Sequence, residues 1–107
     1  MQSIERCFEK ENGWYYLKER PYTLWYKKMN GKTIILCNSP HSILVVDEDI
    51  LLKEEFDNDN IIYDNLIFDD YIKGPPYKIN KDIKWDLKKW LSKKQIEEIF
   101  LMIEYNL

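Results

Sequence analysis

The sequence predicts a single α+β domain with an antiparallel β-sheet of about four to five strands, an N-terminal helix and two C-terminal helices. Three observations favour this class. The chain has 107 residues, which suits one domain, 1–107, with one core. Strand-like segments rich in aromatic and β-branched residues are grouped in the middle of the chain, with helical patterns at its ends. Grouped strands favour an antiparallel sheet over alternating βαβ units.

The N-terminal residues predict a short helix. Ser3 can cap it, Cys7 and Phe8 fall on one side of it, and Asn12-Gly13 provides a stop signal.

The middle of the chain predicts the strands. Asn30-Gly31 accepts the positive φ angles of a type I′ turn and predicts a β-hairpin. Asn38-Ser39-Pro40-His41 predicts a second turn. The segments around these turns that predict strands are Trp14–Leu17, Tyr22–Met29, Lys32–Cys37 and Ser42–Val46.

The stretch after these strands is expected to be partly loop, from Asp47 to Asn60. Residues 61–63, and then 66–68 and 71–72, lie around Asp64-Asn65 and Asp69-Asp70 and predict two short apolar pieces with an acidic turn between them. Gly74-Pro75-Pro76 ends this region.

Two C-terminal helices are predicted from capping signals and periodicity. Asn80 can cap the first, and Ser92 with Gln95 forms a capping-box pattern for the second. The apolar positions are Ile83, Leu87, Trp90 and Leu91 in the first helix and Ile96, Ile99, Phe100 and Ile103 in the second.

The charged residues are distributed unevenly along the chain, with an acidic stretch in a basic remainder. The net charge of −3 combines a stretch from Asp47 to Asp70 with a charge of −9 and a remainder with a charge of +6. The acidic stretch also contains Phe56, Tyr63 and Phe68, with Tyr71 just beyond it. Carboxylates next to large rings are typical of surfaces that attract and then hold a basic partner.

No catalytic or cofactor pattern is found in the sequence. His41 is the only histidine, and neither a G-x-S-x-G motif nor C-x-x-C spacing occurs. An EF-hand loop starting at Asp57 fails because Phe68 stands at the position of the bidentate glutamate. Three glycines do not form a phosphate-binding loop. We therefore expect a non-enzyme without cofactor or metal, with a small metal-dependent hydrolase on the same carboxylates as the third alternative.

The cysteines and hydropathy predict a cytoplasmic protein. Cys7 and Cys37 are the only two cysteines, and no export signal follows the first residues. We expect two buried free thiols. No apolar run approaches 18 residues, so no membrane span is expected.

Nucleic-acid binding is the alternative function. Lys84, Lys88 and Lys93 lie near Trp85 and Trp90 in the predicted helices, and lysines beside rings can hold phosphates and stack bases. The pI of 5.2 and the low count of two arginines argue against it.

In character, the chain resembles the small acidic immunity proteins of bacterial polymorphic and contact-dependent growth inhibition toxin systems. The resemblance rests on the acidic run with its rings, the size, and an alanine-free composition rich in Ile, Lys, Asn and Tyr. Such proteins bind a toxin and block its active site or substrate surface. Phage-borne nuclease inhibitors, including anti-CRISPR proteins, share this character.

We therefore expect a non-catalytic inhibitor of a basic protein toxin, most plausibly a nuclease, that acts through the acidic segment. The expected partner-binding residues are Asp57, Asp59, Tyr63, Asp64, Asp69, Asp70 and Tyr71.

Overall fold

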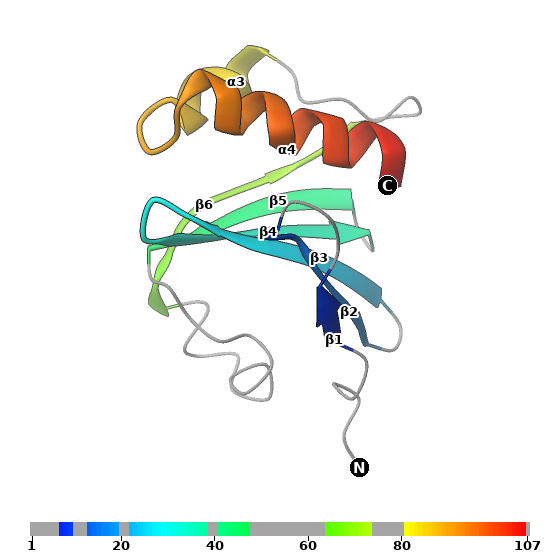
Figure 1. Cartoon of the computed structure of the whole chain (residues 1–107). Helices are drawn as coiled ribbons and strands as arrows, with labels where there is room; N and C mark the ends of the chain where they lie inside the picture. Colours follow the sequence, from blue (N-terminus) through cyan, green and yellow to red (C-terminus); the bar gives the residue numbers. More distant parts are fainter. Residues whose placement is uncertain are drawn as a thin grey trace.

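The computed structural model describes residues 7–9, 13–19, 22–38, 41–47, 64–73 and 81–106. Within these residues the chain forms a six-stranded antiparallel sheet whose strands follow one another in sequence order. Two helices near the C-terminus lie across one face of this sheet (Figure 1). The predicted α+β class is confirmed, with one strand more than the upper end of the predicted range.

The sheet is a meander in which each strand pairs with the next one along the chain. Its strands are β1 (Cys7–Glu9), β2 (Tyr15–Glu19), β3 (Tyr22–Met29), β4 (Lys32–Asn38), β5 (His41–Val46) and β6 (Leu66–Tyr71). The predicted turn between β3 and β4 is confirmed, because Asn30 and Gly31 have φ angles of 53° and 74°. These are the positive values that a type I′ hairpin requires at both central residues.

The predicted N-terminal helix is wrong where the structure describes it. Cys7–Glu9 forms β1, which pairs with Tyr15–Leu17 of β2 in antiparallel register. A strand this short is held by its pairing with the following strand, and this pairing overrides weak helical spacing. The predicted cap Ser3 and stop residue Asn12 lie outside the described residues.

Asp69 and Asp70 lie inside β6 and not in the predicted acidic turn. Asp64 is helical and Asn65 alone forms a turn before β6, where the Asn65 carbonyl accepts a hydrogen bond of 2.7 Å from the Asp47 amide. Residues 48–63, with the predicted loop and Ile61–Tyr63, lie outside the described part of the chain.

The two C-terminal helices are α3 (Lys81–Leu87) and α4 (Lys93–Asn106). The predicted capping box of α4 is confirmed in both directions. The Gln95 amide donates to Ser92 Oγ over 3.2 Å, and the Ser92 amide donates to Gln95 Oε1 over 2.9 Å. The predicted cap of the first helix, Asn80, lies outside the described residues.

The main core lies between the helices and the sheet. Strand alternation directs one set of side chains toward the helices, and the helical apolar positions meet them. We call this set the helix-side core, which contains Trp14, Met29, Ile34, Leu36, Ile43, Val45, Ile72, Ile83, Leu87, Leu91, Ile96, Ile99 and Ile103. A smaller buried cluster on the opposite face of the sheet contains Leu24, Tyr26, Ile35 and Val46.

Polar contacts fix the helix layer on the sheet at two points. At the hairpin tip, Asn30 Nδ2 donates to the Trp90 carbonyl and to Gln95 Oε1, both at 2.9 Å. On α4, the Glu98 carboxylate accepts a hydrogen bond of 2.9 Å from Trp14 Nε1 and pairs with Lys27 of β3. The helices therefore sit at a defined position on the sheet.

Candidate functional site

The structure describes four of the seven expected partner-binding residues, which are Asp64, Asp69, Asp70 and Tyr71. The other three, Asp57, Asp59 and Tyr63, lie outside the described residues. Asp64 is exposed and helical, two residues before β6 begins, and the remaining three lie in β6 itself. Because β6 is the last strand in the order of the sheet, these residues are placed at a sheet edge.

Alternation along β6 separates the three strand residues between two faces. Asp69 pairs with Leu44 and Tyr71 pairs with Ser42. Leu44 packs against the smaller cluster, so Asp69 and Tyr71 lie on the face opposite the helices. Asp70 pairs with Ile43 of the helix-side core and therefore lies on the other face.

Asp69 and Tyr71 form an exposed acidic and aromatic pair. The side chain of Asp69 is exposed, and Tyr71 retains 63% of its surface in contact with solvent. Two residues of extended strand separate their Cα atoms by about 6–7 Å. We call Asp64, Asp69 and Tyr71 the acidic edge; a partner could meet charge and a large ring there together.

Asp70 makes a contact that protects the strand edge. Since the Ile72 amide donates to the His41 carbonyl on β5, alternation directs the preceding amide, that of Tyr71, away from β5. Asp70 Oδ1 accepts a hydrogen bond of 2.8 Å from this Tyr71 amide. A carboxylate that occupies an outward amide blocks the addition of a further strand at that point.

Cys37 lies on the same face as the acidic edge, where β4 pairs with β5. It is a free thiol, half-buried, and pairs with Ser42 in the strand register. Burial raises the pKa of the Cys37 thiol from 9.0 to about 11; a hydrogen bond with Ser42 acts to lower it, and the charge of Asp69 raises it. The thiol is protonated at neutral pH and is a poor nucleophile there.

This pKa predicts slow alkylation of Cys37 in the folded protein. In a Cys7→Ser background at pH 8, we expect iodoacetamide to react about 100-fold more slowly with the native protein than with the urea-unfolded chain, because two pKa units separate the thiolate fractions. The raised pKa also stabilises the fold below about pH 9, and this contribution is lost as the pH rises toward 11. Equal alkylation rates in the two states would contradict this environment.

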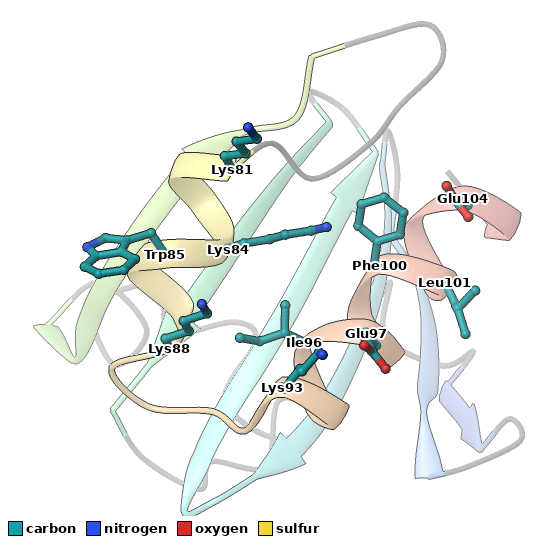
Figure 2. Close-up of a pocket in the computed structure, with 10 residues that line it drawn as sticks. All are labelled: Lys81, Lys84, Trp85, Lys88, Lys93, Ile96, Glu97, Phe100, Leu101 and Glu104. Atoms are coloured by element: carbon teal, nitrogen blue, oxygen red, sulfur yellow. The ribbon is translucent and has the colours of Figure 1, made fainter.

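A second surface feature is a groove on the outer face of the helix layer, with a volume of about 640 Å³. Its α3 side carries Lys81, Lys84, Trp85 and Lys88; its α4 side carries Lys93, Ile96, Glu97, Phe100, Leu101 and Glu104 (Figure 2). We call it the helix groove. Two of its apolar side chains are unusually exposed, Trp85 at 69% and Leu101 at 51%.

Lysines of the groove lie over aromatic rings. Lys84 Nζ is 4.5 Å from the centre of the Phe100 ring, and Lys88 Nζ is 5.7 Å from that of Trp85. The sequence located these lysines beside Trp85 but did not indicate Leu101 as a surface residue. The sequence did contain one signal for it, the run Ile99-Phe100-Leu101. Three consecutive apolar residues of a helix cannot all lie on its buried face.

Neither feature resembles a catalytic or metal centre. Among the described residues, no group of three or more His, Cys, Asp or Glu side chains comes together to hold a metal ion. None of the described helices has the length and apolar character needed to cross a membrane. Asp69 and Tyr71 lie on the sheet face opposite the helices, and the helix groove lies on the outer face of the helix layer.

Comparisons with family models, with curated proteins and with solved structures find no match to this chain.

Proposed function

We propose that this protein is a non-catalytic inhibitor of the immunity type, which binds a basic protein toxin, most plausibly a nuclease, through its acidic edge. The observation that carries the proposal is the exposed Tyr71 beside the exposed Asp69 on one face of a terminal strand. Tyrosines of this kind are frequent binding hot spots, and neighbouring carboxylates speed the encounter with a cationic surface.

The charge distribution supports the same partner class. The segment from Asp47 to Asp70 has a net charge of −9, and the structure describes Asp47, which pairs with Lys32, and residues 64–70 of it. A field of one sign raises the association rate for the opposite sign and repels polyanions. A basic nuclease domain fits this surface, and occlusion of its substrate-binding face would inhibit it without chemistry on either side.

The contacts also divide the roles of the described acidic residues. Asp64 and Asp69 supply long-range attraction, and Tyr71 supplies the buried anchor once the partner is bound. Asp70 holds the amide of Tyr71 and so fixes the strand that presents the ring. A phage-borne nuclease inhibitor would use the same chemistry.

The test is capture followed by kinetics. Tagged wild-type protein is used to capture binders from a nuclease-treated lysate of the native host, beside an Asp64→Lys/Asp69→Lys/Tyr71→Ala variant and an Asp82→Lys control from the exposed face of α3. We expect a basic protein with the wild type and the control, and none with the triple variant. In surface plasmon resonance, the association rate of the wild type should fall at least tenfold from low to high salt.

Two outcomes would overturn the proposal. One is an association rate and salt dependence that Asp64→Lys/Asp69→Lys leaves unchanged. The other is recovery of nucleic acid with both proteins before nuclease treatment and of no protein after it, which would favour the lysines of the helices.

A further inference from the structure

The charged and apolar side chains of the helix groove occur in pairs, one from α3 and one from α4, at successive heights along the groove. We call each height a level. α3 and α4 run in opposite directions across the groove (Figure 2). The contact of Lys84 with Phe100 sets one level, since these two residues face each other. One turn away in each direction, Lys81 lies level with Glu104 and Lys88 lies level with Glu97.

The middle level carries one exposed apolar side chain on each helix, beyond the Lys84–Phe100 contact. Trp85 on α3 and Leu101 on α4 point outward on the two sides of the groove and are two of the three most exposed large apolar side chains described. Each side of the groove therefore has an exposed apolar residue between two charged levels. These two levels carry Lys81 and Lys88 on α3 and Glu104 and Glu97 on α4, and Lys93 lies beyond Glu97 at the start of α4.

This arrangement is complementary to itself. Consider a second copy related to the first by a two-fold axis that runs parallel to the groove. Each residue of the second copy then lies at the same level as in the first copy but on the other side of the groove, so that α3 of one copy faces α4 of the other. Lys81 then faces Glu104 of the second copy, Lys88 faces Glu97, and Trp85 faces Leu101. The same three pairs recur on the other side of the axis, as an isologous interface requires.

We propose that the helix groove is the interface of a homodimer, with a second copy of this chain as its occupant. Trp85 and Leu101 form its apolar centre, which is the part of an interface that contributes most affinity. The two charge pairs on each side fix the register. Lys84 stays over Phe100 of its own chain, where it extends the apolar surface by its aliphatic stem.

Other occupants fit the groove less well. A nucleic acid would place phosphates beside Glu97 and Glu104, and the exposed apolar centre would remain without a partner suited to it. An acidic helix of another protein would satisfy the lysines and leave the two carboxylates unpaired. The second copy pairs both glutamates with Lys81 and Lys88, which are groups already present on the chain.

The dimer leaves the acidic edge accessible. Asp69 and Tyr71 lie on the sheet face opposite the helices, so that a dimer through the helix layer presents two such surfaces outward. The inference therefore goes beyond the proposed function and does not depend on it, because dimerisation is measured without any partner.

The test is analytical ultracentrifugation of the full chain, as wild-type protein and as two charge-reversal variants of one proposed ion pair. We expect wild-type protein to show a monomer–dimer equilibrium between 1 and 500 µM. Lys88→Glu and Glu97→Lys should each weaken the dimer at least tenfold, because each places two like-charged pairs across the axis. An equimolar mixture of these two variants should form a heterodimer within about threefold of the wild-type affinity, since every pair is again of opposite charge.

The controls separate the interface from general effects on folding. Lys94→Glu changes the same charge on exposed α4 surface outside the groove and should leave the dimer unchanged. Trp85→Ala should abolish dimerisation, and circular dichroism should show that each variant remains folded. The inference is overturned if wild-type protein is monomeric at 500 µM, if the mixed variants fail to associate, or if single-stranded DNA binds the monomer and Lys88→Glu removes that binding.

Discussion

Replacement of Ile99 by alanine is expected to lower the free energy of unfolding by about 3–4 kcal/mol. Ile99 is fully buried in the helix-side core, on the face of α4 that packs on the sheet. The substitution removes apolar contacts and leaves a cavity that close-packed neighbours refill only in part. Urea denaturation measures the change, and the thermal midpoint should fall by roughly 10–20 °C.

The matched control for this prediction is Leu101→Ala, two positions along the same helix. Leu101 is 51% exposed, so at protein concentrations at which the chain is monomeric its truncation should change the free energy of unfolding by no more than about 0.5 kcal/mol. If the two variants lost equal stability, α4 would not present the face toward the sheet that the structure assigns to it.

The second large effect is expected at Glu98. Its carboxylate accepts a hydrogen bond from Trp14 Nε1 and pairs with Lys27. In Glu98→Ala, the indole N–H of Trp14, a residue only 1% exposed, is left without this acceptor, and Lys27 loses its counter-charge. An unsatisfied buried donor costs about 1–3 kcal/mol, so we expect a loss of about 2–3 kcal/mol in the free energy of unfolding.

A graded series checks this cause. Glu98→Gln keeps an oxygen acceptor for Trp14 and should cost only about 1 kcal/mol, because it loses the charge alone. Glu97→Ala removes an exposed carboxylate of the same helix and should have almost no effect at protein concentrations at which the chain is monomeric. A Gln variant as unstable as the Ala variant would show that the charge pair, and not the indole bond, holds the helix in place.

Local chemistry explains which parts of the fold could be predicted from the sequence. Asn30-Gly31 fixes its own backbone angles, and Ser92 with Gln95 satisfies amides within one turn, so neither depends on distant residues. The apolar positions of α4 follow from a period that the sequence displays directly: Ile96, Ile99 and Ile103 are all buried.

The failures have a common physical origin in the pairing between strands. Cys7–Glu9 becomes a strand because of its pairing with Tyr15–Leu17, which no local pattern displays. Asp69 and Asp70 have low intrinsic preference for strands, yet they lie in β6, where a sheet edge suits charged side chains.

For the two candidate surfaces, the composition of each segment could be predicted from the sequence, whereas the relative positions of its side chains could not. The acidic composition of the 47–70 segment was visible in the sequence, whereas the separation of Asp70 from Asp69 and Tyr71 needed the register of β6 with β5. Similarly, the lysines and Trp85 were visible as a local group. Their alignment with Glu97, Leu101 and Glu104 needed the packing of one helix beside the other.

The measurement that tests the central claim most directly is hydrogen exchange of the complex between this protein and the basic protein that it captures. We predict that binding slows exchange at residues 64–73, above all at the outward amides of β6 such as that of Tyr71. Residues 81–106, which form the helix layer on the other face, should keep the protection that they have in the free protein. Protection confined to 81–106, with no change at β6, would contradict the assignment of the acidic edge as the binding surface.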